Sequence, residues 1–73
     1  MRAMSTKGQA GRAIRVLRAR NDWSQEHLAQ LSGISRGTIN AIERGKSSPN
    51  IATIEAIARA GEITSGELLD LGL

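Results

Sequence analysis

One local pattern occurs four times in this chain of 73 residues. A Ser, Thr or Asn follows an apolar residue or Pro49, and a second apolar residue stands four positions further along. This pattern is typical of a helix start, where the polar side chain accepts a backbone N–H bond and the two apolar residues pack together as a hydrophobic staple. The four predicted N-cap residues are Ser24, Ser35, Asn50 and Thr64. They predict a chain built of short helices.

The predicted helix ends agree with these starts. Gly33, Gly45 and Gly61 each follow a stretch with apolar residues at helical spacing, and we expect a left-handed cap residue at each. Glu67 stands three residues after Thr64, which completes a capping box. Together the starts and ends predict five helices, over residues 10–20, 25–32, 36–44, 51–60 and 65–71.

Composition supports an all-α fold in a single domain. Ala, Ile and Leu dominate the apolar residues, Phe and Tyr are absent, and Trp23 is the one aromatic residue. A β-sandwich is typically richer in aromatic and β-branched residues. We expect Trp23 to pack as a staple on Leu28 rather than to stack on a nucleic acid. The core positions expected from helical spacing are Ile14, Leu17, Leu28, Leu31, Ile39, Ile42, Ile51, Ile54, Ile57, Ala58, Leu68 and Leu69.

Catalysis, metal binding and cofactors are not expected. The chain has no Cys and one His, so it lacks thiol nucleophiles, disulfides and the usual ligands of a structural zinc site. That residue, His27, has no second ligand near it in the sequence and is expected to be a solvated helix residue. Without a nucleophile and base that could act together, we predict a protein that is not an enzyme.

The charges are unevenly distributed, although the net charge is only +3. Residues 1–20 contain six bases and no acid, whereas residues 55–73 contain four acids and one base. A basic front and an acidic rear indicate one face turned toward a polyanion. Residues 2–9 contain no apolar run that could form a signal peptide or membrane span, so we expect a cytoplasmic protein. We expect the basic residues 1–8 to be disordered and residues 9–73 to form the domain.

The second and third predicted helices form a helix-turn-helix over about residues 24–44. The turn between them is short and contains Gly33, as this motif requires. Such a turn forces a steep crossing, so the second helix of the motif stands out from the body. Its exposed face contains no acid and can enter a DNA major groove. The residues of that face are Arg36, Gly37, Asn40, Ala41 and Arg44, with Thr38 to one side.

The stretch from about residue 12 to residue 60 resembles the phage-repressor and Cro-type (XRE-like) helix-turn-helix domain. The resemblance rests on IRxLR before the motif, WSQExLA in its first helix, GISRxTIxxIERGK through its second, and Pro49 before the next helix. It implies a compact five-helix, lambda-repressor-like DNA-binding domain. Members of this family usually act as homodimers on inverted-repeat operators.

The resemblance also implies roles for individual residues. Gln25 anchors a DNA phosphate and buttresses the third helix, and Arg36 reads a base. Arg18 and Glu43 match a pair that bridges the first and third helices. Two positions depart from the family pattern: His27 replaces a common Glu, and Gly37 replaces a longer polar side chain. The full expected DNA-binding set is Gln25, Ser35, Arg36, Thr38, Asn40, Ala41, Arg44 and Lys46.

These observations predict a sequence-specific regulator of transcription, a repressor from a bacterium or phage that binds a double-stranded operator. The alternative is an antitoxin-like or adaptor module whose third helix binds a toxin or another protein. The arginines Arg12, Arg15 and Arg20 are expected to form a solvated face rather than to contact DNA directly. A homodimer is expected through an apolar strip at the rear of the domain, drawn from Ile63, Leu68, Leu69, Leu71 and Leu73.

Overall fold

The computed structural model describes the backbone of residues 6–73 and the side chains of residues 8–73. This part of the chain folds into five helices: α1 (Thr6–Asn21), α2 (Gln25–Ser32), α3 (Arg36–Glu43), α4 (Ile51–Ala60) and α5 (Ser65–Asp70). The all-α, five-helix prediction is therefore confirmed. Helix α1 begins four residues earlier than predicted, at Thr6. The expected disorder of residues 1–5 lies outside the described residues.

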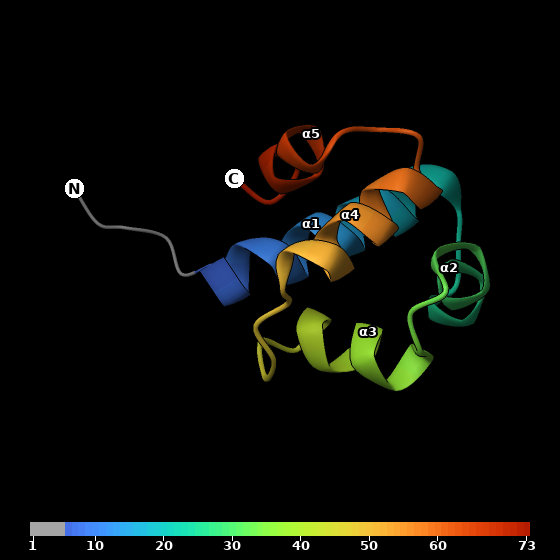
Figure 1. The fold of residues 1–73 in the computed structure, drawn as a ribbon, viewed down its shortest axis with the longest axis horizontal. Helices are drawn as coiled ribbons and strands as arrows, with labels where there is room; N and C mark the ends of the chain where they lie inside the picture. The colour runs from blue at the N-terminus through green and yellow to red at the C-terminus, as the bar shows by residue number, and fades with distance from the viewer. Residues whose placement is uncertain (1–5) are drawn as a thin grey trace.

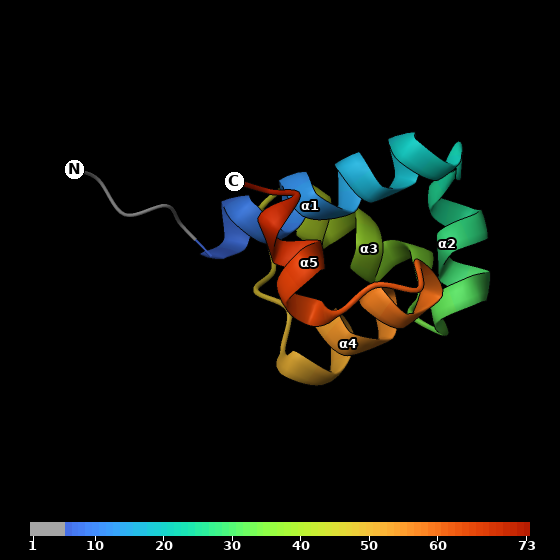
Figure 2. The same ribbon diagram turned by 90° about the horizontal axis from the view of Figure 1, so that it is seen from above.

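Helices α1 and α4 lie between α3 on one side of the domain and α5 on the other (Figure 1). Helix α1 packs on both α3 and α5, while α4 packs on α2 and α5. Seen from above, α5 lies across α1 and α4 (Figure 2). The two helices of the helix-turn-helix, α2 and α3, also pack on each other. Because α2 packs on α4 and α3 packs on α1, both helices attach the motif to the rest of the domain.

All four predicted N-caps are present. The side chains of Ser24, Ser35, Asn50 and Thr64 each accept a hydrogen bond of 2.8 to 3.1 Å from the backbone N–H three residues later. The Oε1 atom of Glu67 accepts from the backbone N–H of Thr64 at 2.9 Å, which confirms the capping box. The starts of α2, α3, α4 and α5 are thus each satisfied by residues within one turn, as capping requires.

Two of the three predicted left-handed glycines are confirmed and one is wrong. Gly33 and Gly45 have φ values of +78° and +73°. Gly61 has a φ of −91°, and the left-handed residue after α4 is Glu62, with a φ of +59°. A Cβ at Gly61 would lie 2.8 Å from Cδ1 of Leu17. The glycine therefore serves the close approach of α1 rather than the turn.

The core lies where the five helices meet, and each helix contributes at least one buried residue to it. Trp23 packs against the edge of the core, which confirms a packing role for this aromatic residue. The centroid of its ring lies 5.9 Å from that of His27. Two expected core residues are wrong: Leu31 is 48% exposed and Ile51 is 74% exposed. Leu31 lies off the buried line of α2, and Ile51 begins α4 before that helix reaches the core. The buried apolar residues are Ala10, Ala13, Ile14, Leu17, Leu28, Ile39, Ile42, Ile57, Ala58 and Leu68.

Candidate nucleic-acid interface

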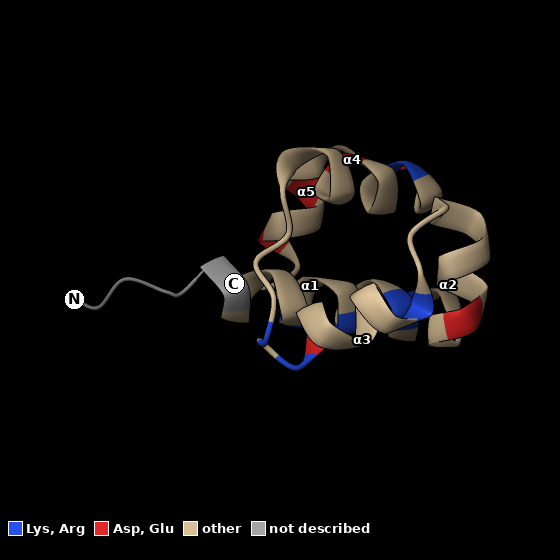
Figure 3. Cartoon of the chain, turned by 60° about the horizontal axis from the view of Figure 1, so that its bottom comes forward, with Lys and Arg blue, Asp and Glu red and all other residues tan. Residues whose placement is uncertain are grey.

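Helix α3 turns one face inward and presents the other to solvent. Its inner face buries Ile39, Ile42 and the carboxylate of Glu43, which is the only acid of this helix. The predicted outward residues do lie outward: Arg36, Gly37, Thr38 and Arg44 are exposed, and Asn40 and Ala41 are half-buried. Lys46 is exposed in the following loop. Lys and Arg lie along α1, at the start of α3 and in the loop after it, while acids lie on α2, at the end of α3 and on α5 (Figure 3).

The turn between α2 and α3 is fixed by short-range hydrogen bonds. The backbone N–H of Gly33 donates to the carbonyl of Ala29 at 2.9 Å, and the N–H of Ile34 donates to the hydroxyl of Ser32 at 3.1 Å. The Ser35 hydroxyl accepts from the N–H of Thr38 and donates to its Oγ1 at 2.9 Å. The side chain of Ser35 is thus engaged in starting α3, which sets the direction in which that helix leaves the turn.

A buried ion pair joins α1 to α3. The guanidinium of Arg18 donates from Nε to Oε2 of Glu43 at 2.7 Å and from Nη2 to Oε1 at 2.9 Å. The side chains are 22% and 5% exposed, respectively. The third contact of this guanidinium runs from Nη1 to the carbonyl of Trp23 at 3.0 Å. The hydrogen bond to Glu43 raises the pKa of Arg18 above its ordinary value. This is the pair that the family resemblance implies.

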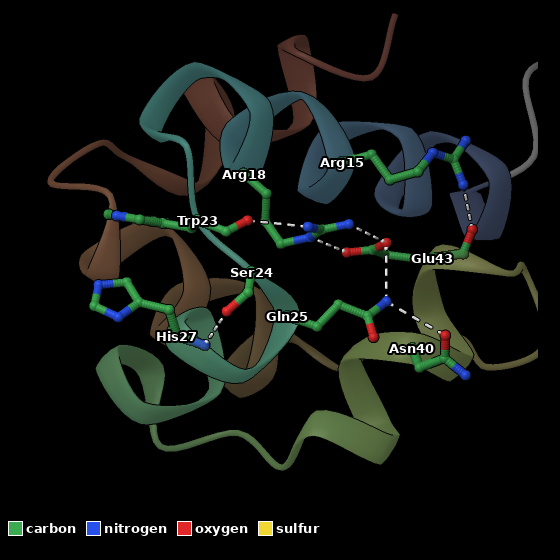
Figure 4. Close-up of polar contacts among 8 residues, drawn as sticks. All are labelled: Arg15, Arg18, Trp23, Ser24, Gln25, His27, Asn40 and Glu43. Atoms are coloured by element: carbon green, nitrogen blue, oxygen red, sulfur yellow. Dashed lines mark hydrogen bonds and ion pairs between the residues drawn. The ribbon is translucent and has the colours of Figure 1, made fainter.

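Gln25 connects α2 to the same pair. Its Nε2 atom donates to Oε1 of Glu43 at 3.2 Å and to Oδ1 of Asn40 at 3.3 Å (Figure 4). The buttressing contact expected of Gln25 is therefore present. Four side chains from three helices, Arg18, Gln25, Asn40 and Glu43, form one polar cluster behind the outward face of α3.

Two residues of α1 contact the end of α3 in a way that the sequence does not predict. Arg15 donates from Nη1 to the backbone carbonyl of Glu43, where a cation is favourable at a helix C-terminus. Gly11 lies so close to α3 that a Cβ there would be 2.6 Å from the carbonyl oxygen of Ile42. A glycine inside a helix is a sequence signal for such a close approach. The contact of Arg15 has no sequence signal, because it depends on where α3 ends in space.

The rear of the domain is attached to α1 through backbone carbonyls. Gln9 donates from Nε2 to the carbonyl of Leu69 at 2.9 Å, and Arg12 donates from Nε to the carbonyl of Gly72 at 2.8 Å. The expectation that Arg12 belongs to a solvated face is therefore wrong, because this side chain lies half-buried against the segment after α5. Of the expected rear strip, Ile63, Leu68 and Leu71 pack on the core, Leu69 is half-buried and Leu73 is 77% exposed.

A family model described as helix-turn-helix matches residues 14–68. The chain belongs to the helix-turn-helix family HTH_3. It is 40% identical over 50 residues to the competence pilus inhibition repressor of Acinetobacter baylyi, which covers 68% of this chain and 46% of the relative. It is 36% identical over 56 residues to the cryptic phage CTXphi transcriptional repressor RstR of Vibrio cholerae, which covers 77% and 50%. The chain thus spans about half the length of these two relatives.

The fold also matches a solved structure closely. The restriction-modification controller protein C.AhdI from Aeromonas hydrophila superimposes with a TM-score of 0.80 at 35% identity, over 85% of this chain and 94% of that one. These relatives are repressors and a controller protein rather than enzymes, which agrees with the prediction of a non-enzyme. Among the described helices, none is long and apolar enough to cross a membrane.

Proposed function

We propose that this chain is a sequence-specific regulator of transcription, a repressor, that binds a double-stranded DNA operator with α3. The observation that carries the proposal is the outward face of α3. It presents arginines at both ends, while the one acid of the helix is turned inward and paired with Arg18. A helix that projects donors and small residues from a rigid support suits the major groove. The names of the relatives support repression.

The outward residues divide into two kinds of contact. Arg36 stands at the first turn of α3, where its planar fork can grip a base edge. Arg44 and Lys46 lie at the far end of the helix and in the loop, where they suit phosphates. Gln25 stands first in α2, where its backbone N–H can anchor a phosphate while its side chain stays bonded to Glu43 and Asn40. Ser35, Thr38 and Ala41 line the approach to the groove. Phosphate contacts fix the register on the duplex, and base contacts give the specificity.

Selection of binding sites from random duplex DNA tests this proposal. We expect an enriched sequence, and an affinity that falls steeply as salt rises because binding releases counterions from the phosphates. The rival hypothesis, a module whose α3 binds a toxin or another protein, predicts weak binding to every duplex. Enrichment of no sequence, together with a shallow salt dependence, would favour that rival. Action on DNA would place the protein in the cytoplasm.

We also propose that two copies bind an inverted-repeat operator as a homodimer through the rear. A groove of about 450 Å³ lies between the end of α1 and α5, with Leu17, Ile63 and Leu71 among its lining residues. Arg20 lines this groove together with Glu67 and Asp70, so two copies facing each other offer opposite charges. Leu73 stands exposed at the end of the chain beyond α5. A two-fold pair would separate two α3 helices by about 34 Å, one turn of DNA.

A matched pair of exposed apolar residues tests the dimer. Leu73→Ser is expected to weaken self-association in sedimentation and to lower operator affinity. Ile51→Ser is the control, because Ile51 is 74% exposed but lies at the start of α4, and it should leave both unchanged. A chain that stays monomeric at high micromolar concentration while binding its operator tightly would rule out the dimer.

A further inference from the structure

The polar cluster behind α3 has a fixed direction that begins at Arg18. Two donors of this guanidinium occupy both oxygens of the buried Glu43 carboxylate. An ionised carboxylate only accepts hydrogen bonds. The Gln25 group that lies 3.2 Å from Oε1 of Glu43 must therefore be the NH2 end of its amide. The ion pair thus decides which way round the Gln25 side chain lies.

Gln25 passes this direction on to Asn40. The same Nε2 atom lies 3.3 Å from the side-chain amide of Asn40. Because Gln25 offers a donor there, Asn40 must turn its Oδ1 atom toward it. Figure 4 shows the oxygen of Asn40 facing Gln25 and its nitrogen on the far side. The NH2 group is therefore the edge of Asn40 that remains for a ligand.

Asn40 lies on the same outward row of α3 as two arginines. It stands four residues after Arg36 and four before Arg44, and this spacing places all three on one face of a helix. Arginine carries only donors. With the oxygen of Asn40 turned away, the whole row presents hydrogen-bond donors and no side-chain acceptor.

This polarity decides which base Asn40 can recognise. A free asparagine pairs with adenine through both ends of its amide, donating to N7 and accepting from the N6 amino group. An amide that only donates can still bond adenine N7 but faces a second donor at N6, whereas guanine presents two adjacent acceptors, N7 and O6. We propose that Asn40 acts as a donor only and selects a G·C base pair over A·T, and that Gln25 enforces this choice. The inference rests on the proposed function, since it concerns the same DNA-binding face.

The experiment compares sequence preferences of matched variants. Sites are selected from random duplex DNA for the wild type and for Asn40→Ala, and the base pair whose preference disappears in Asn40→Ala is the one that Asn40 contacts. At that pair we expect the wild type to favour G·C over A·T about tenfold. Gln25→Met removes the donor, so the Asn40 amide can turn over, and the preference should fall toward equality. Gln30→Met, an exposed change on the same helix, should leave it unchanged.

The outcomes separate this inference from the function beneath it. If the wild type enriches no sequence, both fail together. If a sequence is enriched but no base pair depends on Asn40, or the dependent pair is A·T, only the inference fails. An unchanged preference in folded Gln25→Met would also overturn it. Should Gln25→Met not fold, side-chain amide NMR of the free wild type decides: the Gln25 NH2 protons should exchange with water more slowly than those of Asn40.

Discussion

Helix α1 is joined to α3 and to α5 by different kinds of contact. Toward α3 it uses an ion pair between two side chains, Arg18 and Glu43, besides the bond from Arg15 to the backbone carbonyl of Glu43. Toward α5, the bonds from Gln9 Nε2 and Arg12 Nε end on backbone carbonyls. The α3 junction fixes the direction of individual side chains, whereas the α5 junction only closes the core. Helix α3, which presents side chains to DNA in the proposed function, is therefore the helix that is held by side chains bonded to one another.

The difference has an energetic consequence. At the α3 junction, Glu43 and Gln25 each bond two other side chains of the polar cluster. The loss of one of these residues therefore leaves partly buried polar groups without a hydrogen-bond partner. A buried charge that has lost its partner is far more costly than a missing surface contact. At the α5 junction, loss of the Gln9 donor leaves one backbone carbonyl without that partner and strands no charged group. The two junctions should therefore respond unequally to comparable damage.

The largest expected effect comes from Glu43→Ala. It leaves the Arg18 guanidinium without its carboxylate and removes one acceptor of Gln25, so unfolding free energy should fall by about 3 kcal/mol or more. Thermal and denaturant unfolding measure this. Glu55→Ala, on the exposed face of α4, is the control and should change stability by no more than about 0.5 kcal/mol.

A double variant separates the stranded charge from lost packing. Arg18→Met combined with Glu43→Met replaces both partners with apolar side chains of similar length, and such replacements are often close to neutral. We expect the double variant to be more stable than Glu43→Ala. Equal instability of the two would mean that packing, not the uncompensated charge, holds α1 against α3.

Glycine to alanine changes compare the two junctions directly. At Gly11 the new Cβ would meet backbone oxygens of Ile42 and Glu43, at 2.6 and 3.1 Å, in a helix that the ion pair keeps from moving. At Gly72 it would lie even closer to the carbonyl oxygen of Gln9. The end of α5 and the segment after it are held against α1 by side-chain bonds to carbonyls rather than by an ion pair, so we expect them to shift more easily than α3. Gly72→Ala should therefore cost about 1 kcal/mol and Gly11→Ala about 3 kcal/mol. The same unfolding measurements rank them, and the reverse order would show that the α5 junction is the more rigid.

The sequence predicted those features that depend on near neighbours. Ser24, Ser35, Asn50 and Thr64 are N-caps because each bonds a backbone N–H three residues away, and a spacing pattern detects that. The family resemblance added the Arg18–Glu43 pair, whose members lie too far apart in sequence for any local pattern to join them. The outward face of α3 followed from the short turn at Gly33 and the helical period.

What the sequence missed depends on how helices meet. Leu31 has the spacing of a core residue, but α2 is rotated so that its buried line passes through Leu28 and Ala29. The glycine at position 61 was assigned to the turn, whereas it makes room for Leu17. The bond from Gln25 to Asn40 joins residues of two helices at an angle that no periodicity encodes. Residue spacing locates a face, but it does not determine the direction of a side-chain amide.

The next smaller effect concerns DNA binding by the outward face. Arg36→Ala should cost about 1–3 kcal/mol on the selected site and relax discrimination at one base pair. Lys46→Ala should weaken all sequences about equally and lower the salt slope by about one. Affinities of both variants are measured on the selected site and on a version with its guanine replaced, each at two salt concentrations. Equal losses on both sites in Arg36→Ala would make that residue a phosphate contact.

The smallest effect is expected from Gly37→Ala, and its sign is opposite to that of Gly11→Ala. Gly37 lies in the first turn of α3 on the outward face, and a Cβ there would meet nothing within 4 Å. Alanine restricts the unfolded chain and favours a helix, so the variant should be more stable by about 0.5 kcal/mol. The melting temperature of the free protein measures this. A lower melting temperature would mean that glycine is needed for the backbone at the start of α3. A higher melting temperature would show that folding does not require the empty space beside Arg36. Any need for that space would then come from a ligand bound on the outward face of α3.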